Sequence, residues 1–150
     1  MNSKKTIDAF FAEKKIAIAG VSENKIKFGY KVYEALKKNN FEVYPINAKY
    51  EKIDDDKCYS SVTDIPEDVK NLIILTPKQA TANVTKEAVS KGIKSIWFQQ
   101  QIETKESLQI AREAGVDFVS KECIFMFLEP VKSIHSFHRF FKKLFGNMPK

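Results

Sequence analysis

A glycine ends the first apolar run of the chain, KIAIAG, and a serine and two lysines follow it. Gly20 ends this run, and Val21, Ser22, Lys25 and Lys27 belong to the polar loop after it. Glycine lets the backbone turn and approach a ligand without a Cβ in the way. The free N–H groups and the dipole of a following helix attract phosphate, and the lysines add positive charge. This order of residue types predicts a loop that binds a phosphate-bearing ligand.

Small or polar residues also follow the later apolar runs. In a parallel α/β sheet, ligands bind outside the carboxyl ends of the strands, so these residues are candidates for the same site. None of them is a strong nucleophile, which favours binding over covalent chemistry. The candidates are Asn47, Lys49, Tyr50, Thr76, Pro77 and Gln99.

The motif around Gly20 departs from two common nucleotide sites and narrows the ligand. A P-loop requires Gly-Lys followed by Ser or Thr, which the stretch GVSENKIKFG lacks. An NAD site requires GxGxxG and an acid after the second strand, whereas this chain has Ser22 and Lys49 at those places. A lysine after the second strand favours a nucleotide with an additional phosphate on its ribose. NADP and coenzyme A (CoA) both carry such a phosphate.

Five segments, taken in order, resemble the small stand-alone CoA-binding proteins, a Rossmann-like family. They are also similar to the CoA-binding domain of the succinyl-CoA synthetase alpha subunit. The segments lie within about residues 13–124 and read IAIAGVSENKIKFGYKVYEAL, FEVYPINAKYEKIDDDKCYSSVTDIPEDV, NLIILTP, GIKSIWFQQ and EAGVDFVSKECI.

The resemblance also implies a role for each candidate residue. The loop of Gly20, Val21 and Ser22 would receive the phosphates of CoA, helped by Lys25 or Lys27. Flanking the adenosine end would be Asn47, Lys49 and Tyr50. Bordering the cleft nearer the pantetheine would be Thr76, Pro77 and Gln99.

We find no set of catalytic side chains in the sequence. The synthetase chemistry uses a phosphorylated histidine and a second subunit, and neither His135 nor His138 lies in the region of the sheet. Cys123 is either a thiol close to that of CoA or a buried apolar residue, and the lack of an activating neighbour favours the buried role. We therefore predict non-catalytic binding of CoA or an acyl-CoA. The alternative is an NADP-dependent enzyme or a nucleotide sensor.

The alternation of elements must position these residues. Short apolar runs alternate with helical patterns, which predicts an α/β fold: a Rossmann-like three-layer sandwich with a five-stranded parallel sheet, plus a C-terminal amphipathic helix. We expect strands over residues 15–20, 41–46, 71–75, 93–98 and 116–119. We expect helices over residues 6–14, 28–39, 78–91 and 105–114. Residues 47–69 read as mostly loop, with the acidic run at 54–56 as a solvated tip.

The positive charge is concentrated at the C-terminal end. The net charge of the 150 residues is +6, and residues 131–150 hold five of the 25 Lys and Arg but none of the 19 acids. We divide the chain into a CoA-binding domain of residues 1–128 and a basic amphipathic helix of residues 129–150. We expect that helix to pack on the domain, on a second copy in a homodimer, or on a protein partner. The alternative is an adaptor that binds a membrane surface or nucleic acid through this helix.

The sequence also bears on location and metal binding. Charges interrupt the apolar residues near the N-terminus, which is unlike a secretory signal, and Cys58 and Cys123 form no CxxC pair. We expect a cytoplasmic protein without a metal site.

Overall fold

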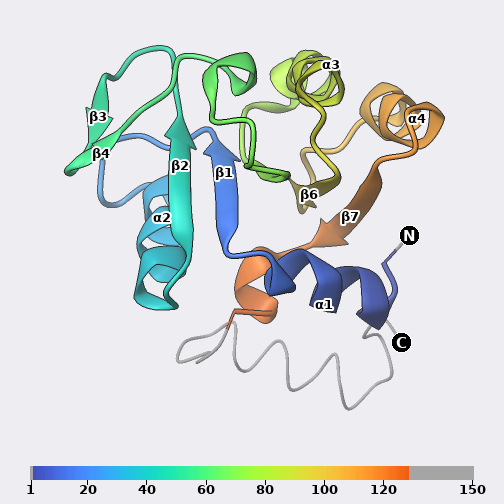
Figure 1. The fold of residues 1–150 in the computed structure, drawn as a ribbon, viewed down its shortest axis with the longest axis horizontal. Coiled ribbons are helices and arrows are strands. Elements are labelled where there is room, and N and C mark those ends of the chain that lie inside the picture. Colours follow the sequence, from blue (N-terminus) through green and yellow to red (C-terminus); the bar gives the residue numbers. More distant parts are fainter. Residues whose placement is uncertain (1, 129–150) are drawn as a thin grey trace.

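Five parallel strands form the central sheet in the computed structural model, which describes residues 2–128 (Figure 1). The order across the sheet is β2-β1-β5-β6-β7, so the chain first adds β2 on one side of β1 and then continues on the other side. This order confirms the predicted fold class. The strands are β1 (Lys15–Ala19), β2 (Glu42–Ile46), β5 (Asn71–Ile74), β6 (Ser95–Gln99) and β7 (Asp117–Glu122).

Helices cover both faces of the sheet and complete three layers (Figure 1). Alternate residues of β1 point to opposite faces: Ile16 and Ile18 pack in the cluster with α1 and α2, whereas Ala17 and Ala19 pack in the cluster with α3 and α4. These four side chains are at most 2% exposed, as expected for a strand buried on both faces. The helices are α1 (Lys4–Ala12), α2 (Phe28–Lys38), α3 (Thr81–Lys91) and α4 (Lys105–Glu113).

The helix ends follow the signals in the sequence. The N-cap residue of α4 is Thr104, whose hydroxyl accepts a hydrogen bond from the backbone N–H of Ser107 at 2.9 Å. Gly92 and Gly115, after α3 and α4, have φ angles of +81° and +69°, the left-handed conformation that commonly ends a helix. Ser3 caps α1 in the same way as Thr104 caps α4, so α1 begins two residues before the predicted start at Thr6.

Residues 47–69 contain more structure than the predicted loop. They form the hairpin of β3 (Lys52–Ile53) and β4 (Asp56–Lys57), followed by the 3₁₀ helix η1 (Val62–Asp64). Strands of two residues are too short to produce an alternating pattern in the sequence. The hairpin lies beside β2 and α2 in Figure 1.

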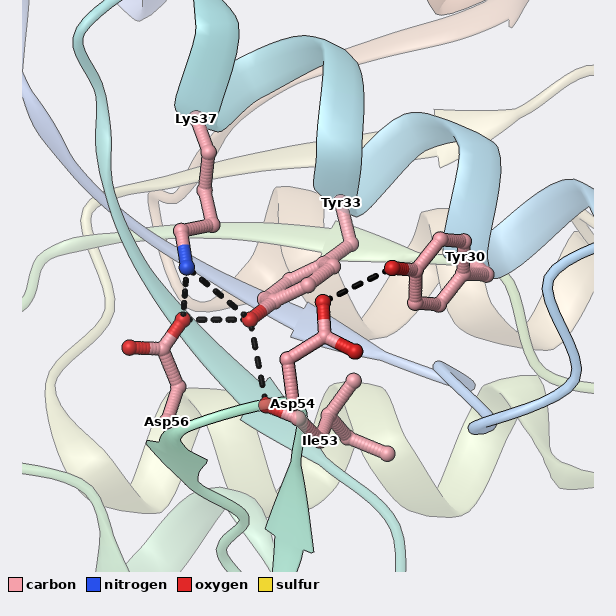
Figure 2. Close-up of polar contacts among 6 residues, drawn as sticks. All are labelled: Tyr30, Tyr33, Lys37, Ile53, Asp54 and Asp56. Atoms are coloured by element: carbon pink, nitrogen blue, oxygen red, sulfur yellow. Dashed lines mark hydrogen bonds and ion pairs between the residues drawn. The ribbon is translucent and has the colours of Figure 1, made fainter.

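The acidic run at the hairpin is attached to α2 and is not only a solvated tip (Figure 2). Tyr30 donates a hydrogen bond to Asp54 at 2.7 Å, and the ammonium of Lys37 lies 2.7 Å from the carboxylate of Asp56. The hydroxyl of Tyr33 contacts the same carboxylate and the backbone oxygen of Ile53. These contacts fix the hairpin on the helix that follows the first turn.

The remaining differences are small. Helix α3 is preceded by the 3₁₀ helix η2 (Lys78–Ala80), so the predicted helix over residues 78–91 begins in a tighter form. Strand β7 continues to Glu122, beyond the predicted end at residue 119, and the 3₁₀ helix η3 (Ile124–Met126) follows it. The predicted amphipathic helix of residues 129–150 lies outside the described residues. None of the helices within residues 2–128 has the length and apolar character needed to cross a membrane.

Candidate functional site

A cavity of about 650 Å³ opens at the carboxyl ends of β1 and β5. This is the place where the strand order reverses, and it is where nucleotide ligands bind in open α/β sheets. Most of the candidate residues meet there although they come from three separate loops. The candidates that line the cavity are Gly20, Ser22, Lys27, Asn47, Lys49, Tyr50, Thr76 and Pro77.

Gly20 lies in a position that only glycine fits without strain. Its φ is +104°, and a Cβ there would lie 2.9 Å from the carbonyl carbon of Leu75 and 3.0 Å from the nitrogen of Thr76. The chain leaving β5 therefore occupies the space of the missing side chain. The sequence predicted that Gly20 makes room for a ligand. In the structure, the backbone of Leu75 and Thr76 already requires a glycine at this position.

Gly29 is a residue of the site that the sequence reasoning missed. A Cβ at this position would lie 2.5 Å from the carbonyl oxygen of Gly20, so the first turn of α2 packs directly against the loop. The third glycine of nucleotide-binding turns has this role of close packing between helix and strand. The spacing from Gly20 to Gly29 is longer than in GxGxxG, which is why the motif comparison did not find it.

The N-terminus of α2 points its free amides toward the loop. Lys27 is the N-cap residue of α2, and no side chain caps the helix there. The first-turn N–H groups of such a helix lack intrahelical partners and carry partial positive charge. The side chain of Lys27 lines the cavity, and the backbone N–H of Asn24 donates to the Ser22 hydroxyl at 3.2 Å. Amides and a cation together form a site for an anion.

Asn47 joins the first and second loops. Its side-chain amide donates to the carbonyl of Val21 at 2.8 Å, and its side-chain oxygen accepts from the backbone N–H of Lys49 at 2.9 Å. The amide is therefore used within the protein. By holding both loops, Asn47 places the exposed side chain of Lys49 at the cavity.

A second cavity of about 630 Å³ adjoins the first, because Ala48, Lys49, Tyr50 and Ser60 line both. The thiol of Cys58 lies in its lining. Burial raises the pKa of this thiol above its usual value. A raised pKa keeps the thiol protonated at neutral pH, which makes Cys58 a poor nucleophile.

Thr76 carries a polar atom without a partner. Its hydroxyl oxygen is buried and makes no hydrogen bond within residues 2–128, although the residue lines the first cavity. Buried hydroxyl groups are normally hydrogen-bonded, so this unpaired oxygen beneath the cavity surface is an exception.

Three candidate residues do not line this cavity. Val21 is fully buried in the core, and the ammonium of Lys25 lies 6.0 Å from the ring centre of Tyr30. The side-chain oxygen of Gln99 accepts a hydrogen bond from the backbone N–H of Ile124 at 3.1 Å, at the end of β6. Cys123 is buried and is also absent from the lining.

Within residues 2–128, no three His, Cys, Asp or Glu side chains lie close enough together to hold a metal ion. Burial, followed by the hydrogen bond to Asp56, raises the pKa of Tyr33, so this hydroxyl stays protonated. His135 and His138 lie outside the described residues.

Comparison with known proteins identifies relatives of two kinds. The family model described as "CoA binding domain" matches residues 14–129. The alpha subunit of the ADP-forming acetate–CoA ligase II of Pyrococcus furiosus is 31% identical over 129 residues, which cover 79% of this chain and 28% of that subunit. The chain thus spans less than a third of this ligase subunit.

Two solved structures of small proteins match nearly their whole length. A conserved hypothetical protein from Pyrococcus furiosus is 38% identical with a TM-score of 0.71, and the match covers 74% of this chain and 96% of that one. A hypothetical protein from Pyrococcus horikoshii is 31% identical with a TM-score of 0.77, and the match covers 83% and 87%.

Proposed function

The chain belongs to the family of CoA-binding domains, and from this premise we propose that it holds CoA or an acyl-CoA without making or breaking a bond itself. The observation that carries the proposal is the cavity at the reversal of strand order, with an uncapped helix N-terminus at its edge. Binding there needs amides, cations and a shaped surface, and these are the groups that line it.

The residues of the cavity fit CoA as a ligand. The amides at the start of α2 and the side chain of Lys27 would hold the diphosphate. Lys49 follows β2 and would attract the 3′-phosphate of the ribose, which a carboxylate at this place would repel. Val21 and Asn47 would support the loops from within the protein.

A role in a larger catalytic system is the second candidate, because a relative is an ADP-forming acetate–CoA ligase subunit. Among the described residues that line the cavity there is neither a histidine nor a cysteine, so we expect no release of ADP from ATP, acetate and CoA in the presence of this chain. Release of ADP at a rate above that of a heat-denatured sample would overturn the non-catalytic assignment.

Calorimetry against four ligands tests the binding proposal. We expect CoA to bind most tightly, dephospho-CoA about tenfold more weakly because it lacks the phosphate near Lys49, and NADP and NAD more weakly still. The substitution Lys49→Ala removes the difference between CoA and dephospho-CoA. The control Lys94→Ala removes an exposed lysine at the opposite end of the sheet and leaves the difference unchanged. Equal affinities of the unsubstituted protein for CoA and dephospho-CoA contradict the role of Lys49.

A further inference from the structure

One side of α3 faces the cavity, together with Ala80, the residue just before this helix. Ala80, Val84 and Glu87 line it, and their spacing of four and three residues places them on the same side of the helix. The adjacent side of α3 carries Thr85 and Ala88, which are fully buried. The cavity thus has a carboxylate in its wall, although the loops of β1 and β2 bring lysines to it.

Glu87 is half-buried and makes no hydrogen bond or ion pair within residues 2–128. A carboxylate accepts hydrogen bonds, so a carboxylate without a protein partner in the wall of a cavity favours a ligand that donates one. A phosphate cannot be that group, because two negative charges repel each other. The phosphates therefore belong at the other side of the cavity, near Lys27 and Lys49.

The surroundings of Glu87 suit a flat aromatic group. Val62 of η1, Leu75 after β5, and Ala80 and Val84 contribute apolar surface to the same cavity. Aromatic bases bind between apolar surfaces and are read by polar groups at their edge. The edge of adenine presents an exocyclic amine, which donates, next to ring nitrogens, which accept. The carboxylate of Glu87 is an acceptor that matches the amine.

We propose that Glu87 recognises the adenine base by accepting a hydrogen bond from its exocyclic amine. This inference rests on the proposed function, because the base is that of CoA. Glu87 is then a specificity-determining residue that selects adenine over bases without the amine.

The test compares CoA with its deaminated analogue, which has hypoxanthine in place of adenine. The analogue has the same shape but presents a carbonyl oxygen where the amine was, so it faces the carboxylate with a second acceptor. We expect the protein to bind CoA at least about tenfold more tightly than the analogue. With Glu87→Ala the preference falls to about twofold or less, and with Glu87→Gln, which keeps an acceptor oxygen, part of it returns.

A matched control is Glu113→Ala, which removes an exposed carboxylate that only accepts a hydrogen bond from Gln109 on α4. This variant keeps the full preference for CoA. Equal affinities of the unsubstituted protein for CoA and the analogue overturn the inference, and so does a preference that persists in Glu87→Ala. Neither result affects CoA binding itself.

A second pair of ligands separates this inference from the proposed function. ADP and IDP differ by the same amine and lack both the pantetheine and the 3′-phosphate. If CoA does not bind but ADP binds more tightly than IDP, the proposed function fails and the base recognition stands. If CoA binds but neither pair is distinguished, the assignment of Glu87 fails and the proposed function stands.

Discussion

The carboxyl ends of β1 and β6 carry similar polar loops, yet only one of them borders the cavity. After β1, Ser22 and Lys27 line the cavity, whereas after β6 the side chain of Gln99 binds the backbone of Ile124. Both loops were candidates from the sequence, because both follow an apolar strand with polar residues. The difference between them lies in the topology of the sheet.

The connections that leave neighbouring strands explain the difference. The chain after β1 passes to α2 on one face of the sheet, and the chain after β5 passes to α3 on the other face, so the two loops separate (Figure 1). The chain after β6 passes to α4, on the same face as α3. A crevice opens where neighbouring connections diverge and not where they run together. Where the connections run together, a polar side chain such as that of Gln99 is available to bind backbone groups of the protein itself.

The largest expected effect comes from adding a side chain at the point where the loop after β1 touches the chain after β5. Gly20→Ala places a Cβ against the backbone of Leu75 and Thr76 at a φ of +104°, and we expect a loss of about 3 kcal/mol in the free energy of unfolding. Gly115→Ala is the matched control, because its φ is +69° but no atom lies within 4 Å of the added Cβ. It should lose only about 1 kcal/mol from backbone strain.

Urea denaturation of both variants measures this difference. If Gly20→Ala loses no more stability than Gly115→Ala, the close contact with the chain after β5 does not restrict Gly20. The requirement for glycine would then come from backbone conformation alone.

A second prediction separates the two loops by function. Gln99→Leu removes the acceptor of the Ile124 N–H, and leaving this buried group unpaired should lower the free energy of unfolding by about 2 kcal/mol. The affinity for CoA should stay within about twofold, since Gln99 does not line the cavity. A loss of CoA affinity of tenfold or more, measured by calorimetry on folded protein, would place Gln99 in the ligand site after all.

The sequence predicted the fold well, because the strands buried on both faces are nearly continuous apolar runs and the helix ends carry Thr104, Gly92 and Gly115. It also predicted which loops lie at the correct edge of the sheet. It could not predict which polar side chains bind the protein itself, because the partners of Asn47 and Gln99 are backbone groups of distant segments. Such contacts leave no periodic pattern in the sequence.

Glu87 and Gly29 were missed for related reasons. A glutamate within a helical pattern is typical of a solvent-exposed face, and only the packing of α3 beside β5 turns it toward the cavity. Gly29 lies one position inside α2 and looks like an unfavourable helix residue until its contact with the carbonyl of Gly20 is known. In both cases the tertiary arrangement gives the residue its meaning.

The smallest expected effect concerns the β3–β4 hairpin, whose flanking residues Lys49, Tyr50 and Ser60 line the cavity. Burial alone would raise the pKa of Asp56, but hydrogen bonds from Lys37 and Tyr33 and the charge of Lys37 lower it below its usual 3.8. A lowered pKa in the folded state means that the ionised carboxylate stabilises the fold. This contribution is complete above about pH 5, where the carboxyl group is ionised in both the folded and the unfolded state, and it is lost as the pH falls through the lowered pKa.

Asp56→Asn should therefore destabilise the protein at pH 7 by less than about 1 kcal/mol, because the side chains of Lys37 and Asp56 are 41% and 35% exposed. The difference from the unsubstituted protein should shrink as the pH is lowered from 5 to about 3 in a series of urea denaturations. The control is Asp55→Asn, at the exposed tip of the hairpin, which should show no such trend. A difference that stays constant with pH would mean that the hairpin is held to α2 by packing and neutral hydrogen bonds, and the ion pair would then have no part in placing the wall of the cavity.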